Sequence, residues 1–314
     1  FSSVDGAKVV SVCDKNPRAL SRVMKDYPDI LVTGDSQEII SSPDTDVITV
    51  ITPVSSHYEL TKAALEAGKH VFVEKPFTAS AAQAEELVEL AEKKKLKIMV
   101  DHTFLFTSAV KKIKEIIDDD ILGDLYYYDS TRVNLGLFQH DVNVIWDLSP
   151  HDFSIMDYLI EERPEAVAAT GRAHINTMED IAYIMVYFTN NIIAHFNVNW
   201  LSPVKLRSTL IGGEKKMLVW NDMDADEKIK IYDRGVEITS KEGIYSLLVN
   251  YRSGDMWAPK VEQVEALRRE TEYFVECVTE NKTPLNDGRS ALRVVKMLEA
   301  CDESLKNNGR MVRL

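Results

Sequence analysis

Short apolar runs alternate with helical segments through about the first hundred residues, and this alternation constrains the fold more than any other feature of the sequence. The apolar runs lie at residues 8–13, 46–51, 71–73 and 96–100. Strands that alternate with helices form βαβ units, whose strands run parallel and are buried. We therefore predict an α/β domain with a parallel sheet over residues 1–120.

The second part of the chain follows a different pattern, in which strand-like segments succeed one another through short turns. These segments lie at residues 165–174, 181–188, 192–200, 205–211, 216–220 and 228–232. Strands joined by short turns form antiparallel sheets. We predict an α+β domain with a mostly antiparallel open sheet over residues 121–314, and we expect this sheet to join subunits of a homodimer or homotetramer.

Composition excludes several classes of protein. The formal net charge of −13 argues against a general binder of nucleic acids or anionic membranes, because both need a basic face. No apolar run approaches the length of a membrane span, which is about 20 residues. Cys13, Cys277 and Cys301 are far apart and match no zinc spacing. We expect reduced thiols, no metal and a cytoplasmic protein.

Polar residues follow three of the predicted parallel strands at their carboxyl ends, where open α/β sheets bind ligands. They are Asp14, the Thr52-Pro53 turn with His57, and the Glu74-Lys75-Pro76 sequence. Pro76 biases Lys75 toward an extended backbone, so the lysine is presented from a defined bend. The alternative is structural: Asp14 starts a helix, and Glu74 and Lys75 form a solvated turn.

Asp14 occupies the position of an acid that binds the ribose hydroxyls of a dinucleotide. In such domains a glycine-rich phosphate loop lies about 20 residues before the acid. That position falls before Phe1, and Gly6 is the single glycine of the first thirty residues. We expect that the chain begins after the first strand and the phosphate loop.

A second group of polar residues lies in the second domain, between a predicted strand and the helix expected at residues 148–160. Asp147 and His151 are four residues apart, so a helix would place the carboxylate beside the imidazole. Histidine is suited to accept a hydroxyl proton near neutral pH. A helix cap with a packed histidine is the structural alternative.

Residues near this pair favour a sugar ligand, which offers hydroxyl groups on its edges and apolar faces to aromatic rings. The candidates for substrate contact are Arg132, Asn134, Trp146 and His151, with Phe138 nearby.

With Glu74-Lys75-Pro76, the Thr52 to His57 loop and the Asp147/His151 pair in this order, the chain resembles the Gfo/Idh/MocA family of nicotinamide-dependent sugar oxidoreductases. The resemblance extends over essentially the whole length. It implies a Rossmann domain, here truncated, followed by a domain for substrate binding and oligomer contacts. It also implies that Lys75 contacts the reacting hydroxyl, that Glu74 lies near the nicotinamide ribose, and that Asp147 and His151 are the family's acid and histidine.

The chain departs from the family after the strand that ends at Val100. Many members have an asparagine or glutamine and an arginine there, whereas this chain has Asp101-His102-Thr103, which makes His102 a candidate cofactor contact. Asp14 favours NAD over NADP, because a carboxylate repels a 2′-phosphate.

The resemblance implies hydride transfer between a sugar carbinol carbon and the nicotinamide. His151 would accept the hydroxyl proton, Lys75 would hydrogen-bond the oxygen, and Asp147 would orient the histidine. The surroundings of Arg132 and Trp146 resemble the branch that oxidises C3 of nucleotide-linked amino sugars such as UDP-N-acetylglucosamine or its uronic acid, with Lys205 or Arg207 assisting Arg132. The alternatives are an inositol or free-aldose dehydrogenase, a catalytically silent sugar sensor or corepressor, and a lyase or epimerase that retains its NAD.

Overall fold

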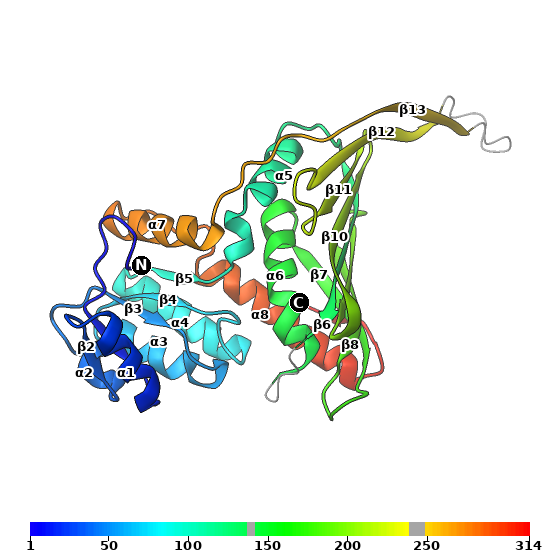
Figure 1. The fold of residues 1–314 in the computed structure, drawn as a ribbon. Coiled ribbons are helices and arrows are strands. Elements are labelled where there is room, and N and C mark those ends of the chain that lie inside the picture. Colours follow the sequence, from blue (N-terminus) through cyan, green and yellow to red (C-terminus); the bar gives the residue numbers. More distant parts are fainter. Residues whose placement is uncertain (137–141, 239–248) are drawn as a thin grey trace. The chain divides into compact units, whose positions relative to one another are not determined.

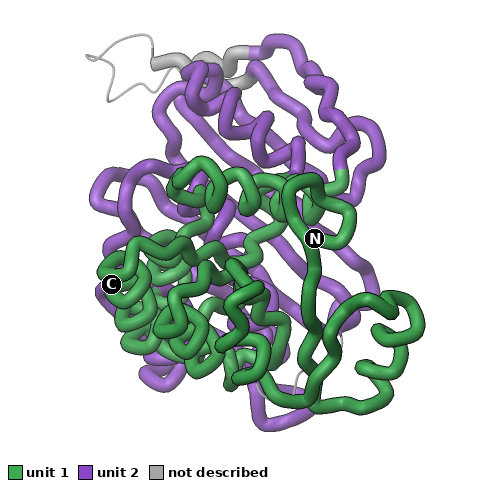
Figure 2. The backbone as a smooth tube through the Cα atoms, turned by 90° about the vertical axis from the view of Figure 1, so that its left-hand side faces the viewer, with its two compact units in different colours: residues 1–106, 265–296 green, residues 107–264, 297–314 purple. Residues whose placement is uncertain are grey.

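The computed structural model describes residues 1–136, 142–238 and 249–314 (Figure 1). It divides into two compact units, and each is made of two stretches of chain (Figure 2). Unit 1 contains Phe1–Phe106 and Glu265–Lys296, and unit 2 contains Thr107–Val264 and Met297–Leu314. The sequence predicts two consecutive domains that meet at residue 120, whereas unit 1 also includes Glu265–Lys296 from near the carboxyl end of the chain.

Unit 1 is built from alternating strands and helices. In chain order these are β1 (Ser11–Cys13), α1 (Pro17–Asp26), β2 (Leu31–Thr33), α2 (Ser36–Ile40), β3 (Val47–Val50), the 3₁₀ helix η1 (Val54–Ser56), α3 (His57–Glu66), β4 (His70–Val73), α4 (Ala81–Lys94), β5 (Ile98–Val100), η2 (Thr103–Phe106) and α7 (Ala266–Thr279), with the first part of α8 (Gly288–Lys306).

The strands of unit 1 pair in parallel, which confirms the predicted Rossmann-type parallel-sheet domain. Among the described residues they form two separate sheets, one of β1 and β2 and one in the order β3-β4-β5. The hydrophobic core of unit 1 includes the second sheet. Val71, Phe72 and Met99 are buried in it, and the ring of Phe274 from α7 lies 5.6 Å from that of Phe72. This contact helps explain why α7 belongs to unit 1.

Unit 2 contains a long sheet and the helices that accompany it. The elements are α5 (Ser108–Asp118), β6 (Leu125–Leu135), α6 (Val144–Leu159), β7 (Pro164–Arg172), β8 (Ile181–Phe188), β9 (Ile193–Asn199), β10 (Leu201–Gly213), β11 (Met217–Asn221), β12 (Ile229–Ile238), β13 (Val249–Trp257) and β14 (Val312–Arg313), with the last part of α8.

The strand order in unit 2 is β13-β12-β11-β10-β6-β9-β8-β7-β14. Within the described part of this sheet, β6 and β9 pair in parallel and the other neighbours are antiparallel. The predicted mostly antiparallel domain is therefore confirmed. The inner face of the sheet packs on α6, where Phe153 and Phe196 meet edge to face with ring centroids 5.0 Å apart.

Helix α6 begins at Val144, one turn earlier than the sequence pattern suggested. Asn143 caps it, because its side-chain Oδ1 accepts hydrogen bonds from the backbone N–H groups of Ile145 and Trp146 at 3.1 and 3.2 Å. The cap places Asp147 in the first turn of the helix. Among the described residues, no helix is both long enough and apolar enough to cross a membrane.

Candidate active site

Lys75 lies in a tight bend directly after β4 in unit 1. The strand ends at Val73, and the Glu74 backbone N–H donates to Val50 O at 2.9 Å. The Lys75 N–H then donates to the Glu74 carboxylate at 3.1 Å, and the peptide bond between Lys75 and Pro76 is cis. Because Pro76 and Phe77 are buried behind this bend, the backbone around Lys75 is held by packing as well as by hydrogen bonds.

A cluster of carboxyl groups lies at the carboxyl ends of β4 and β5. Burial, with a smaller contribution from the Asp101 carboxylate, raises the pKa of Glu74 to about 7. The same two causes raise the pKa of Glu270 to about 9. Glu270 is fully buried on α7 and accepts hydrogen bonds from Thr103 Oγ1 at 2.8 Å and from Asn286 Nδ2 at 2.9 Å. At neutral pH the cluster therefore retains protons that isolated carboxyl groups would lose.

The loop after β3 is organised by His57. Its imidazole is buried, with Nε2 2.7 Å from the carbonyl oxygen of Thr52 and Nδ1 2.9 Å from that of Pro76. The ring thus links the Thr52-Pro53 turn to the bend that follows Lys75. Both partners are main-chain carbonyls, so the contacts observed for His57 are structural.

The other cofactor candidates of unit 1 differ in exposure. Asp14 is exposed just after β1, and its Oδ1 accepts the backbone N–H of Asn16 at 2.7 Å. Thr52 and Pro53 are also exposed, and Thr52 Oγ1 accepts from Ser56 Oγ at 2.8 Å. By contrast, His102 is buried directly after Asp101.

In unit 2, Asp147 and His151 lie one turn apart on α6, as their spacing predicted. The Asp147 carboxylate accepts a hydrogen bond from the indole Nε1 of Trp200 at 3.0 Å. Trp200 follows β9 and is fully buried. Gly136 allows this indole to fit, because a Cβ at that position would lie 2.7 Å from Trp200 Cδ1. Sequence reasoning did not identify Trp200.

Arg132 forms a buried ion pair with Asp152, which joins β6 to α6. Its Nε donates to Asp152 Oδ2 at 2.6 Å and its Nη2 donates to Oδ1 at 2.9 Å, and both residues are at most 4% exposed. Asp152 did not figure among the candidates from the sequence. These contacts of Arg132 are thus internal to unit 2.

Trp146 is also held inside unit 2. It is 7% exposed, and its indole Nε1 donates to the Asp302 carboxylate on α8 at 2.8 Å. Asn134 is partly exposed near the end of β6. Phe138 lies outside the described residues.

The predicted site residues therefore fall into two groups. Unit 1 contains Lys75 and the candidate cofactor contacts, and unit 2 contains Asp147, His151 and the candidate substrate contacts. The structure connects Glu74 to Lys75 and His57 to Thr52 within unit 1, and it connects Asp147 to Trp200 within unit 2.

Comparison with known proteins gives consistent matches for both units. Residues 1–102 match the oxidoreductase family with an NAD-binding Rossmann fold, GFO_IDH_MocA, and residues 110–219 match the GFO/IDH/MocA C-terminal domain. Scyllo-inositol 2-dehydrogenase (NAD(+)) of Bacillus subtilis is 26% identical over 90% of this chain and 82% of its own length. The uncharacterized oxidoreductase YdgJ of Escherichia coli is 33% identical, but the match spans only 42% of this chain and 40% of YdgJ.

UDP-N-acetylglucosamine 3-dehydrogenase of Acidithiobacillus ferrooxidans is similar in sequence and in fold. It is 24% identical over 80% of this chain and 76% of its own length. Its solved structure superposes with a TM-score of 0.79 and 21% identity over 95% of this chain and 90% of that chain, which supports the fold. With both of its domains matched in order, the chain belongs to the Gfo/Idh/MocA family of NAD-binding oxidoreductases.

Proposed function

We propose that this protein is an NAD-dependent dehydrogenase that transfers hydride between a hydroxyl-bearing carbon of a sugar and the nicotinamide. The observation that carries the proposal is the bend after β4, where Lys75 follows a strand end and its N–H is bound by the Glu74 carboxylate. Carboxyl ends of parallel strands are the ligand-binding edge of α/β sheets. In our proposal, a lysine whose backbone is held at that edge serves chemistry rather than solvation.

The residues of unit 1 fit part of a dinucleotide. Asp14 is exposed at a strand end and suits the adenosine ribose hydroxyls, and its charge favours NAD over NADP. Glu74 suits the nicotinamide ribose, and Thr52 and Pro53 lie exposed after the neighbouring strand. Within residues 1–136, 142–238 and 249–314, no glycine-rich turn between a strand and a helix is present for the pyrophosphate. For the two buried histidines, we propose that His57 supports the loop and that His102 supports the strand end.

When bound, NAD supplies a hydride acceptor at C4 of the nicotinamide. In our proposal Lys75 Nζ donates a hydrogen bond to the reacting oxygen and stabilises negative charge on it. His151 accepts the hydroxyl proton on its imidazole. Asp147, which is itself fixed by Trp200, orients and charge-stabilises that imidazole.

For the substrate, we propose a nucleotide-linked amino sugar that is oxidised at C3. The support is the similarity to an enzyme named UDP-N-acetylglucosamine 3-dehydrogenase. Because the contacts of Arg132 are internal and Arg207 pairs with Asp222 at 3.3 Å, the exposed Lys205 on β10 is the better candidate for an anionic group, with Asn134 for the sugar. The similarity to scyllo-inositol 2-dehydrogenase favours an inositol as the alternative, with a free aldose as a related one.

A sugar sensor that has lost catalysis is the rival from another class. It is disfavoured because a sensor has no need of Lys75, Asp147 and His151 together.

We also propose that the unit 2 sheet joins subunits of a homo-oligomer, since it exposes Tyr126, Tyr183 and Leu206. Light scattering on the Tyr183→Lys variant tests this assembly, with Lys93→Glu as a surface control. We expect the molar mass of the particle to fall for Tyr183→Lys and to stay unchanged for Lys93→Glu.

The function is tested by mixing the protein and NAD with UDP-N-acetylglucosamine, its uronic acid, scyllo-inositol and free aldoses, and by following the absorbance of reduced nicotinamide. We expect reduction with the nucleotide sugars. Sugar binding without reduction would indicate a sensor. Product formation without net reduction would indicate a lyase or epimerase that retains its cofactor.

A further inference from the structure

The buried carboxyl group of Glu270 is tied to the end of β5. Its Oε1 accepts a hydrogen bond from Asn286 Nδ2 at 2.9 Å. Asn286 is itself held by the main chain of Val100, because its Nδ2 donates to Val100 O at 2.6 Å and the Val100 N–H donates to Asn286 O at 3.0 Å. One oxygen of Glu270 therefore has a fixed donor, and the other oxygen, Oε2, faces Thr103.

Thr103 connects Glu270 to Asp101. Its Oγ1 lies 2.8 Å from Glu270 Oε2 and also contacts Asp101 Oδ1. A hydroxyl group has one proton, so Thr103 can donate to only one of these two oxygens at a time. The other contact is a hydrogen bond only if that carboxyl group is protonated and donates to the Thr103 oxygen. Asp101 and Glu270 are also hydrogen-bonded to each other, which likewise needs a proton between two carboxyl groups.

Glu270 is the better holder of this proton. It is fully buried, whereas Asp101 is partly exposed, and burial disfavours the charged form of a carboxyl group. Burial, with a smaller contribution from Asp101, accordingly raises the pKa of Glu270 to about 9. Protonated Glu270 is then the donor toward Thr103 and Asp101, and the contact between Thr103 and Glu270 runs from the acid to the hydroxyl oxygen. Asp101 is left as the acceptor.

Asp101 continues the network to the bend at Lys75. Its main-chain N–H donates to Val73 O at 2.8 Å, at the end of β4, and its side chain hydrogen-bonds the Glu74 carboxyl group. Glu74 Oε2 in turn accepts the Lys75 N–H at 3.1 Å. Contacts thus converge on the Asp101 carboxyl group from two sides, from Glu270 beneath it and from the Lys75 bend through Glu74.

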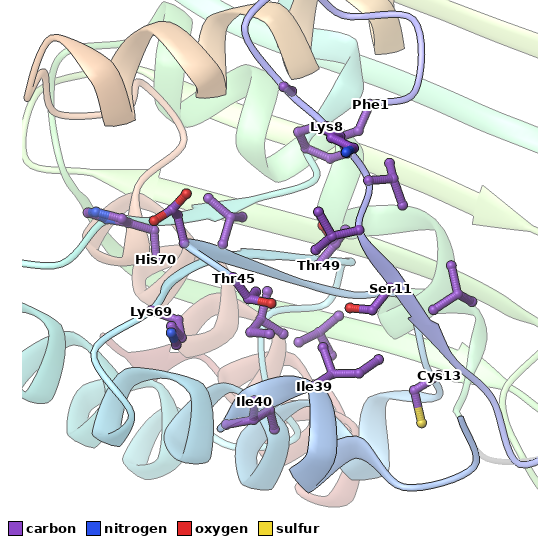
Figure 3. Close-up of a pocket in the computed structure, with 18 of the residues that line it drawn as sticks. Phe1, Lys8, Ser11, Cys13, Ile39, Ile40, Thr45, Thr49, Lys69 and His70 are labelled. Carbon is purple, nitrogen blue, oxygen red and sulfur yellow. The ribbon is translucent and has the colours of Figure 1, made fainter. Parts of the chain in front are cut away.

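The network does not open onto the large cavity of unit 1. This cavity of about 950 Å³ is lined by Thr49 of β3 and His70 of β4 (Figure 3), and by Phe274 of α7. Glu270 lies one turn before Phe274 and does not line the cavity, and neither do Asp101, Thr103 and Asn286. The cavity therefore gives no direct path for water to these four side chains, and their hydrogen bonds are made with one another.

We propose that Glu270 is a positioning residue for Lys75 and that it acts as a neutral hydrogen-bond donor. It directs Thr103 and Asp101, Asp101 directs the Glu74 carboxyl group, and Glu74 holds the main chain of Lys75. The proposal rests on the proposed function, in which Lys75 must be held at a defined distance from the reacting oxygen. The alternative is that Glu270 only fills space under β5.

Two substitutions of Glu270 separate these roles. Glutamine keeps an acceptor oxygen for Asn286 and offers N–H groups where the neutral acid offers its O–H, whereas leucine fills a similar volume with neither. We expect Glu270→Gln to retain most of kcat. We expect Glu270→Leu to lower kcat by roughly ten- to a hundredfold, with KM for the sugar nearly unchanged, because the lysine is misplaced rather than removed. Glu272→Leu, exposed on the same helix, is the matched control and should leave kcat unchanged. Equal losses in the two Glu270 variants, or full activity of Glu270→Leu, would overturn the proposal.

Thr103 provides a second set of variants that changes no carboxyl group. Thr103→Val removes the hydroxyl at nearly constant volume and should lower kcat, whereas Thr103→Ser keeps the hydroxyl and should restore it. Thr49→Val, on β3 beside the cavity, is the control (Figure 3). Because Thr103 and Glu270 act in one network, the double variant Thr103→Val/Glu270→Leu should lose little more than the weaker single variant. Losses that multiply would mean independent roles and would overturn the proposal.

Amide hydrogen exchange at Lys75 tests the same connection without substrate or cofactor. Exchange of the Lys75 N–H should be faster in Glu270→Leu than in the wild type by roughly fivefold, the effect of one hydrogen bond, and unchanged in Glu270→Gln. Unchanged exchange in Glu270→Leu would overturn the proposal. If the wild type oxidised no sugar while exchange at Lys75 still followed Glu270, the proposed function would fail and the connection from Glu270 to the Lys75 bend would stand.

Discussion

The indole Nε1 of Trp200 donates a hydrogen bond to the carboxylate of Asp147 at 3.0 Å. Trp200 is fully buried, and the carboxylate lies in the first turn of α6, one turn before His151. The bond fixes the direction of an acid whose proposed role is to orient an imidazole. Trp200 is thus a positioning residue in our account, although it is far from α6 in sequence.

Trp200→Phe should reduce kcat while leaving KM for the sugar nearly unchanged. The substitution keeps most of the ring and removes the donor to Asp147, so the histidine loses its oriented partner. A hydrogen bond to a charged group is worth about 1.5–3 kcal/mol, which corresponds to roughly ten- to a hundredfold in rate if all of it is lost in the transition state.

The control for this variant is Trp220→Phe. Trp220 is also buried, and its Nε1 has no hydrogen-bond partner within the described residues. It should change neither kcat nor the pH profile. An equal loss of activity in both variants would mean that packing alone explains the effect.

Removal of either partner of the Arg132–Asp152 ion pair should destabilise the protein, because the other charge would remain buried without a partner. Arg132→Met leaves the buried Asp152 carboxylate without its bidentate partner, and we expect a loss of about 3–5 kcal/mol in the free energy of unfolding. Asp152→Leu should have a similar effect, because it leaves the Arg132 guanidinium buried without its partner. The double variant Arg132→Met/Asp152→Leu should recover much of the loss, because no charge is left unpaired. Urea unfolding measures all three, and an additive double variant would contradict the assignment.

The stability of the protein should fall as pH rises from about 4.5 to about 9. Burial raises the pKa of Glu270 from 4.5 to about 9, so across this range the native protein binds more protons than the unfolded chain. Glu74, with its pKa raised to about 7, adds to the slope between pH 4.5 and 7. The stabilisation is complete below pH 4.5 and is lost as the pH approaches 9.

Glu270→Gln should flatten this dependence, since an amide of similar size does not ionise. The free energy of unfolding, measured with denaturant at pH 5.5 and pH 8.5, should differ between these pH values by on the order of a few kcal/mol in the wild type and by less in the variant. Glu272, on the same helix but exposed, provides the control Glu272→Gln. A slope unchanged by Glu270→Gln would show that Glu270 does not hold the proton.

Local patterns were sufficient to predict the two sheet types. Apolar runs between helical segments predicted the parallel strands β1, β3, β4 and β5 but not β2, and strands joined by short turns predicted the antiparallel sheet without β13 and β14. The spacing of Asp147 and His151 predicted their shared helix, because i and i+4 residues lie one turn apart. These features depend on neighbours in sequence, which is why they could be read from it.

Long-range pairing could not be predicted in the same way. Glu270 reaches Thr103 only because α7 returns to unit 1, and nothing near either residue in the sequence indicates this contact. The polar density around Arg132 suggested a ligand, but its guanidinium is bound by Asp152, and Trp146 is bound by Asp302. Buried polar groups require partners, so a dense polar segment can satisfy itself internally as readily as it can bind a sugar.

The central claim is that Lys75 acts on the reacting oxygen, and the turnover of Lys75→Met with a substrate from the sugar panel tests it most directly. Lys93→Met on α4, an exposed lysine, is the matched control. We expect Lys75→Met to lower kcat by at least about 100-fold, the usual contribution of a group that assists proton transfer, with NAD affinity preserved. The control should retain full activity. Turnover of Lys75→Met equal to that of the control would contradict the account.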